Sequence, residues 1–272
     1  MMKKKDIAKF RRVIWNYYKK YGRQLPWRQT QSPYRVLVSE IMLQQTQVAR
    51  VISKYKLFLK LFPTFSVLAK ASVSDVLKTW QGLGYNRRAL ALKRLAQVVV
   101  SEYDGKLPQE RTTLIDLPGI GPYTASALLV FAHDRSEVMV ETNIRRTFIH
   151  FFFKNLNHIS DSTLLPLIEA TLDTRHPRTW YFALMDYGAM LGLTTDNANR
   201  RSAQYNRQSR FEGSLRQVRG AILKVLSAID SITVSSLVKK LKFPFEKVHQ
   251  AMIDLVREQF IVSFRGRVRL VS

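Results

Sequence analysis

The stretch Leu117-Pro118-Gly119-Ile120-Gly121-Pro122-Tyr123-Thr124-Ala125 carries the clearest structural signal in this 272-residue chain. Two glycines separated by one apolar residue, after a proline, predict a tight turn whose backbone N–H groups face one way. The following run, 124–133, predicts a helix with a small and polar first turn. Such a helix start, with the helix dipole behind it, forms an anion site. The stretch therefore indicates a hairpin that holds a phosphate.

The composition points to a partner of negative charge. The chain has 44 Lys and Arg against 20 Asp and Glu, which gives a formal net charge of +24. Such a charge opposes compaction and is typical of proteins that bind nucleic acid. The plainer alternative is a solvated basic surface. Hydrophobic residues make up 46% of the chain, which is enough for a packed core.

The chain has no cysteine, which excludes disulfides, cysteine nucleophiles and cysteine-ligated zinc or iron–sulfur sites. The five histidines show no ligand spacing, so we expect no metal site. Lys9, Arg11 and Arg12 interrupt the first apolar segment, and no run of eighteen apolar residues occurs. We therefore expect no membrane contact and a cytoplasmic protein, associated with the nucleoid if the source is prokaryotic.

Apolar residues recur at three- and four-residue spacing through the first 190 positions, which predicts an all-α body over 1–195. Segment 196–212 is polar and basic, and reads as a linker. From 213 to 272 we expect a small winged-helix-like domain: helices over Arg216–Ile229, Thr233–Leu241 and Pro244–Gln259, then a β-hairpin over 261–271. The alternative is a helical cap that only packs on the body.

The predicted hairpin carries Arg265, Arg267 and Arg269. Alternate positions of a strand share one face, so these three cations are expected on one side of the wing. This pattern favours DNA contact by the wing.

Glu40 stands in the apolar stretch 33–47, which predicts a helix. Burial there would raise the pKa of its carboxyl and keep a proton near neutral pH. That is what a general acid acting on a ring nitrogen needs. A single glutamate in such a helix is more often salt-bridged or partly exposed, so the position alone does not decide between the two.

The run Leu43-Gln44-Gln45-Thr46-Gln47 after Glu40 resembles the signature of MutY-type adenine DNA glycosylases of the helix-hairpin-helix superfamily. The similarity covers about residues 20–192. It implies a two-lobed, all-α fold with a DNA cleft between the lobes. It also implies that Glu40 is the catalytic acid.

Two further stretches resemble parts of that family. Arg23-Gln24-Leu25-Pro26-Trp27-Arg28 is similar to its R-x-L-P-W-R, which implies that Arg23, Trp27 and Arg28 frame the extruded base. Gly82-Leu83-Gly84-Tyr85 is similar to its G-L-G-Y turn, whose tyrosine enters the duplex. Gln45, flanked by Gln44 and Thr46, matches the glutamine that fills the stack. A planar amide or ring restores stacking lost when a base flips.

The second acid departs from the family. Its aspartate, which offsets charge at C1′ as the glycosidic bond breaks, is replaced by Glu141, two residues before Asn143. The extra methylene moves the carboxylate by about one bond length, a shift that active sites feel. Tyr123 stands where lyase-competent relatives place a lysine, which implies a monofunctional glycosylase.

The resemblance also assigns phosphate contacts. Leu117, Gly119, Gly121 and Thr124 would anchor a phosphate 3′ of the lesion. Arg146, Arg200, Arg201 and the basic segment up to Arg210 would add salt-sensitive affinity.

Three departures concern cofactor and specificity. The family's cluster cysteines are replaced by Gly192, Asn199, Ser202 and Gln208, so we expect no iron–sulfur cluster and no other cofactor. Phe182 occupies the position where adenine-specific members read the base edge with Glu or Gln. The C-terminal part is too short for the Nudix-like domain that recognises 8-oxoguanine.

The expected function is release of a mismatched base, first of all adenine opposite 8-oxoguanine or guanine, by a monomer acting on double-stranded DNA with a mismatch or damaged base. One alternative is a mismatch thymine or uracil glycosylase, which Tyr123 and an apolar residue at Phe182 favour. Another is a non-catalytic protein that binds mismatched DNA, which Glu141 and the missing cluster favour.

Overall fold

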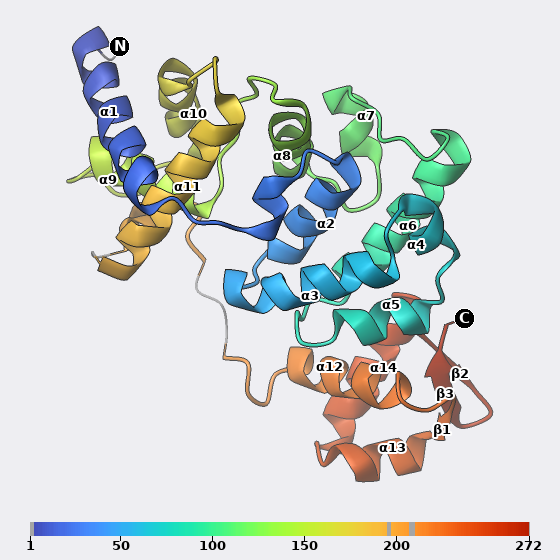
Figure 1. Ribbon diagram of the computed structural model, residues 1–272. Helices are drawn as coiled ribbons and strands as arrows, with labels where there is room; N and C mark the ends of the chain where they lie inside the picture. The colour runs from blue at the N-terminus through green and yellow to red at the C-terminus, as the bar shows by residue number, and fades with distance from the viewer. Residues whose placement is uncertain (1–2, 195–196, 207–209, 272) are drawn as a thin grey trace. The chain divides into compact units, whose positions relative to one another are not determined.

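The computed structural model describes residues 3–194, 197–206 and 210–271. Their helices are α1 (Lys4–Tyr21), η1 (Pro26–Gln29), α2 (Pro33–Leu43), α3 (Val48–Leu61), α4 (Phe65–Lys70), α5 (Val73–Trp80), α6 (Arg87–Glu102), α7 (Arg111–Asp116), α8 (Pro122–His133), α9 (Thr142–Phe152), α10 (Asp161–Thr171), α11 (Pro177–Thr194), η2 (Ala198–Arg201), α12 (Leu215–Leu226), α13 (Val234–Leu241) and α14 (Phe245–Arg257). The strands are β1 (Ile232–Thr233), β2 (Ile261–Phe264) and β3 (Arg267–Leu270). The mostly helical fold expected from the sequence is confirmed (Figure 1).

The described residues form two compact units. The first unit contains 3–37, 109–116 and 120–206, and the second contains 38–108, 117–119 and 210–271. The boundary expected at 195/196 falls on residues outside the described ranges, and the boundary expected at 212/213 stays a prediction.

The first unit is built around α11, which packs against α1 and α9. Its core is aromatic: the ring of Phe10 lies 5.3 Å from that of Phe148 and 6.0 Å from that of Trp180. A glycine sets the approach of α9, because a Cβ at Gly188 would lie 2.1 Å from the carbonyl oxygen of Asn143. Gly188 therefore lets the start of α9 lie directly against α11.

In the second unit, α6 packs against α4 and α5. The fully buried side chains of Phe58 and Trp80 form its centre, with ring centroids 5.9 Å apart. This packing sets the positions of the ends of α5 and α6, between which the turn 82–85 runs.

Residues 213–271, here called the C-terminal module, belong to the second unit and contain three helices and three antiparallel strands in the order β1-β3-β2 (Figure 1). The three helices and the hairpin were predicted from the sequence, and the Ser/Thr cap is Thr233, whose side chain accepts from the N–H of Ser236 at 3.2 Å. The two-residue strand β1 was not predicted, because so short a segment carries no alternating pattern.

The wing differs from the expectation in one respect. Arg265 and Gly266 have φ of +47° and +71° and form the two-residue turn between β2 and β3. A turn with two positive φ values matches the twist of the flanking strands. Only Arg267 and Arg269 therefore alternate along β3, and the expectation of three arginines on one strand was wrong.

Among the described helices, none combines the length and the hydrophobicity that a membrane span requires. Within 3–194, 197–206 and 210–271, no group of three or more His, Asp or Glu side chains is arranged to hold a metal ion.

Candidate active site

Glu40 lies in the second half of α2, in the second unit. Its neighbours along the helix, Val38, Ile41 and Met42, are buried, and Glu40 itself is only 8% exposed. The helix thus places a carboxyl group in a buried position.

Two turns of the second unit carry the side chains predicted to enter the duplex. Gln45 follows α2 with φ of +53°, and Tyr85 precedes α6 with φ of +47°. Both values are unfavourable for residues other than glycine, so the surroundings must hold them. Thr46 joins the two turns, because its hydroxyl donates to the carbonyl oxygen of Leu83 at 3.2 Å.

Arg88 is the residue that holds these turns, and the sequence reasoning missed it. Its guanidinium donates to the carbonyl oxygens of Ile41 (2.8 Å), Met42 (3.0 Å), Leu83 (3.3 Å), Gly84 (3.0 Å) and Gln44, and to the hydroxyl of Thr46 (3.0 Å). Burial lowers the pKa of Arg88 to about 10, so the group stays cationic at neutral pH. Only the fold shows this role, since its acceptors are backbone carbonyls that no motif records.

In the first unit, the residues predicted for the base pocket gather around Asp186 of α11, a residue that the sequence reasoning also missed. Arg23 donates from its backbone N–H at 2.8 Å and from Nε at 2.6 Å. Arg28 donates from both terminal nitrogens, at 2.8 and 2.7 Å. The Asp186 side chain is 1% exposed and that of Arg28 8%. The buried carboxylate thus fixes both arginines, and Trp27, between them in the sequence, is buried at 6% exposure.

Burial raises the pKa of the Asp186 carboxyl, but hydrogen bonds and positive charge from Arg28 and Arg23 outweigh burial and leave the pKa below its usual 3.8. The site is therefore a fixed carboxylate with two cations at neutral pH.

Phe182 packs within this group. Its ring stacks on that of Phe131 with centroids 4.8 Å apart and planes at 9°, and it is 7% exposed. The guanidinium carbon of Arg28 lies 4.5 Å from its centroid and that of Arg178 5.3 Å. Phe182 thus supports the arginines by cation–π contact. The resemblance implies that adenine-specific members have Glu or Gln at this position.

The hairpin that opened the sequence analysis runs from α7 to α8. Leu117 and Ile120 are buried, at 4% and 5% exposure. Gly119 has φ of +81°, and a Cβ there would lie 2.8 Å from that of Ala91. Gly121 caps α8 without a side chain, and a Cβ at Gly121 would meet nothing within 4 Å. Gly121 and Pro122 at the start of α8 are exposed, Tyr123 is half-buried, and Thr124 is buried at 3% exposure.

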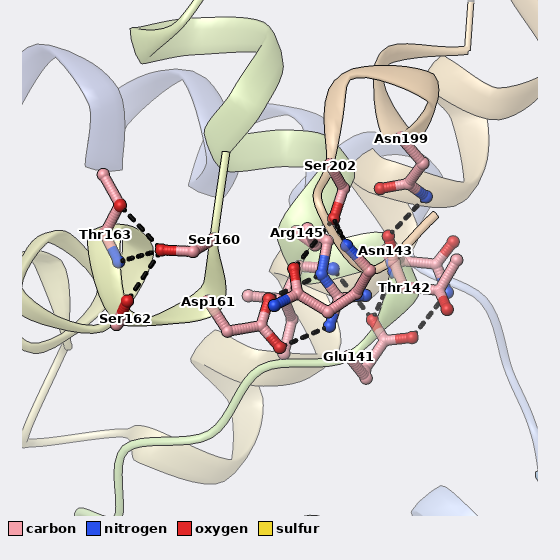
Figure 2. A network of polar contacts seen from close by, with 12 residues as sticks. Glu141, Thr142, Asn143, Arg145, Ser160, Asp161, Ser162, Thr163, Asn199 and Ser202 are labelled. Atoms are coloured by element: carbon pink, nitrogen blue, oxygen red, sulfur yellow. Dashed lines mark hydrogen bonds and ion pairs between the residues drawn. The ribbon is translucent and has the colours of Figure 1, made fainter. Parts of the chain in front are cut away.

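Glu141 is the N-cap residue of α9 (Figure 2). Its Oε1 accepts from the backbone N–H of Asn143 at 2.7 Å and of Ile144 at 2.8 Å, and its Oε2 accepts from Nδ2 of Asn143 at 3.2 Å. The longer side chain thus folds back onto the helix start, where a shorter aspartate is the common cap. The carboxylate has one fixed orientation.

Burial raises the pKa of the Glu141 carboxyl above its usual 4.5. The two backbone N–H groups and the charges of Arg145 and Arg146 lower it, but burial prevails. Arg145 also forms a bidentate ion pair with Asp161, at 2.7 and 2.8 Å (Figure 2).

Of the four positions that the resemblance assigns to cluster cysteines, the structure describes three, Gly192, Asn199 and Ser202. Gly192 leaves room for Arg146, since a Cβ at Gly192 would lie 2.7 Å from its guanidinium. Arg146 donates to the carbonyl of Gly188 at 2.7 Å, to Oδ1 of Asn143 at 2.9 Å and to Oδ1 of Asn197 at 3.1 Å. Arg146 therefore ties α9 to α11 and to the segment that follows.

The rest of that segment is held by hydrogen bonds too. Asn199, 5% exposed, donates to the carbonyl of Thr142 at 2.9 Å (Figure 2). Ser202 forms a backbone bridge with Ile159. Arg201 donates to the carbonyls of Phe153 and Lys154, just after the end of α9, while Arg200 is exposed. Gln208 lies outside the described residues. No thiolate exists in the chain, so these residues do not fit an iron–sulfur cluster.

The predicted site residues thus fall into separate groups. Arg23, Arg28 and Phe182 meet around Asp186, and Glu141 and Asn143 meet Arg146, all in the first unit. The turns of Gln45 and Tyr85 meet at Arg88 in the second unit, which also holds Glu40.

Residues 38–163 match the HhH-GPD superfamily of base excision DNA repair proteins. The chain is 38% identical to the adenine DNA glycosylase of Mycolicibacterium smegmatis, over 78% of each protein. It is 35% identical to that of Buchnera aphidicola subsp. Baizongia pistaciae, covering 69% of this chain but only 54% of that relative. It is 32% identical to a thymine/uracil-DNA glycosylase of Methanothermobacter thermautotrophicus, over 66% of this chain and 82% of the relative. A solved thermostable thymine-DNA glycosylase matches with a TM-score of 0.64 and 30% identity, over 71% of this chain and 91% of the other.

Proposed function

The chain belongs to the HhH-GPD superfamily of base excision DNA repair proteins, and on that premise we propose that it is a monofunctional DNA glycosylase that releases adenine opposite 8-oxoguanine or guanine. Its substrate is double-stranded DNA with a mismatch or damaged base, on which it acts as a monomer in the cytoplasm.

The observation that carries this proposal is the buried Glu40, which precedes the Gln45 turn in the same helix-turn segment. A buried carboxyl in this position would act as the general acid that gives a proton to a ring nitrogen of the leaving base as the C1′–N bond breaks. Gln45 and Tyr85, fixed by Arg88, fill the space that the flipped base leaves.

The other groups take the remaining roles. Arg23, Trp27 and Arg28 frame the base. Glu141, fixed on the start of α9, stabilises the cation at C1′ when its carboxyl is ionised, and water then adds there to leave an abasic site. The hairpin glycines bind a phosphate at the start of α8, where Gly121 and Pro122 are exposed. The hydrogen bond of Asn199 and the backbone bridge of Ser202 hold the segment that an iron–sulfur cluster would otherwise hold, and no cofactor takes part.

A second candidate is a mismatch thymine or uracil glycosylase. Phe182 supports it, because a stacked phenyl ring cannot read the hydrogen-bonding edge of adenine. Tyr123 is consistent with both candidates.

The test is single-turnover base release from duplexes with A opposite 8-oxoguanine, A opposite G, T opposite G, U opposite G and hypoxanthine opposite T. We expect release of adenine, with strand cleavage only after alkali. Release of thymine or uracil alone would establish the second candidate. Tight binding without release of any base would establish a non-catalytic DNA-binding protein.

The pKa of Glu141 gives a prediction about pH. Because this pKa is raised, the carboxylate takes up a proton at a higher pH than an exposed glutamate does, and base release should fall as the pH drops through that value. The Nδ2 group of Asn143 donates to the Glu141 carboxylate and so favours its anionic form. Asn143→Ala removes this donor, so the acid limb of the rate profile should move to still higher pH.

The measurement is the single-turnover rate across the acid-to-neutral range. Asn155→Ala, an exposed amide of the same unit, serves as control and should leave the profile unchanged. An acid limb that is identical in Asn143→Ala and the wild type would remove Glu141 from the reaction.

A further inference from the structure

The turn 82–85, here called the wedge turn, has an unusual backbone. Gly82, Gly84 and Tyr85 have φ of +92°, +71° and +47°. A tyrosine rarely adopts this conformation on its own. Part of the support comes from Trp80, whose Nε1 donates to the carbonyl of Gly84 at 3.1 Å, and part from Arg88. Neither of these contacts reaches the Tyr85 hydroxyl, which is the outer end of the side chain.

The C-terminal module is attached to the chain on both sides of the wedge turn. Before the turn, the side-chain amide of Gln81 donates to the hydroxyl of Ser227 at the end of α12. After it, Nε of Arg87 donates to Glu258 at 2.6 Å. Further along α6, the guanidinium of Arg94 donates to the side-chain oxygen of Gln259 at 2.9 Å. These contacts lie within one compact unit and frame the wedge turn.

Glu258 makes this attachment strong. Besides Arg87, it accepts two hydrogen bonds from Arg219 of α12, at 2.8 and 2.5 Å. Burial raises its pKa, but the two arginines outweigh burial and lower the pKa to about 2. The carboxylate is therefore charged at any physiological pH and fixes α12 and the residues after α14 to the start of α6.

Arg216 lies three residues before Arg219, one turn earlier on α12. Its guanidinium donates to the hydroxyl of Tyr85 at 3.0 Å. The Tyr85 side chain is 37% exposed, so its ring remains accessible while its hydroxyl is held. The fixed Arg219 thus determines where Arg216 presents its donor.

We propose that the C-terminal module positions Tyr85 for entry into the duplex, with Arg216 as the residue that fixes the tyrosine hydroxyl. This inference rests on the proposed function, in which Tyr85 enters the base stack. A side chain that is already oriented loses less freedom on binding, so insertion is faster. The C-terminal module thereby takes part in base flipping through Arg216, independently of any DNA contact by its β-hairpin.

The test is a double-mutant cycle with Tyr85→Phe, which removes only the hydroxyl, and Arg216→Met, which removes the donor. The readout is the rate at which 2-aminopurine, placed next to adenine opposite guanine in a duplex, becomes unstacked and fluorescent. Each single variant should slow this step about three- to tenfold. The double variant should be no slower than the slower single variant, because both remove one contact. Effects that multiply, or an Arg216→Met variant as fast as the wild type, would overturn the proposal.

Lys224→Met is the matched control, since it removes an exposed cation from the same helix and should retain the wild-type rate. Thermal unfolding of all variants should coincide, which separates positioning from a loss of folding. The two proposals fail separately. Unstacking without release of any base overturns the proposed function alone, whereas base release without coupling between Tyr85 and Arg216 overturns this inference alone.

Discussion

Glu40→Gln is expected to reduce base release by a factor of about 10²–10⁴ while the protein still folds and binds DNA. The substitution keeps the size and shape of the side chain, which is 8% exposed within α2, so packing around it changes little. An amide has no acidic proton to give to the leaving base. The base must then depart unprotonated, which raises the barrier to breaking the C1′–N bond.

The measurement is the single-turnover rate on the duplex that the wild type cleaves best, with affinity measured on the same duplex. Glu102→Gln changes an exposed carboxylate at the end of α6 and should leave the rate unchanged. If Glu40→Gln kept the wild-type rate, another group would have to supply the proton. Weak affinity together with a normal rate would instead make Glu40 a structural residue.

Asp186→Asn is expected to lower the free energy of unfolding by about 3–5 kcal/mol, the cost of breaking a buried ion pair on one side. The carboxylate is 1% exposed and accepts hydrogen bonds from Arg28, which is 8% exposed, and from Arg23. An asparagine cannot accept all four hydrogen bonds, and its neutral amide leaves the buried guanidinium of Arg28 without a countercharge. Base release should fall as well, because both arginines of the proposed base pocket lose their anchor.

The stabilisation by Asp186 has a defined pH dependence. Its pKa is lowered in the folded protein, so its contribution is fully present above the unfolded value near 3.8 and is lost as the pH falls through the lowered folded value. Urea unfolding at neutral pH should therefore show the full difference between Asp186→Asn and the wild type. Glu169→Gln, an exposed carboxylate of the same unit, should change stability by less than about 0.5 kcal/mol. A loss below about 1 kcal/mol for Asp186→Asn would show that the arginines find other partners.

Several elements could be predicted from the sequence because their causes are local. The glycines and prolines of 117–121 predict the hairpin, and the spacing of apolar residues around Glu40 predicts its helix. The cap at Thr233 and the turn near Gly266 follow from the preferences of single residues. The sequence also determined that thiolate ligands are absent, since no fold can supply a cysteine that the chain lacks.

The centres of the candidate site could not be predicted, because their partners are far apart in the chain. Asp186 looks like one polar residue in an apolar helix until the fold brings Arg23 and Arg28 to it, across more than 150 positions. Arg88 looks like one cation among 44, and only the backbone carbonyls around it show what it holds. Arg216 and Tyr85 are 131 positions apart and resemble a surface charge and a wedge residue with no relation to each other. Local preferences specify turns, caps and helices, whereas the pairing of charges and donors depends on packing that only the tertiary structure provides.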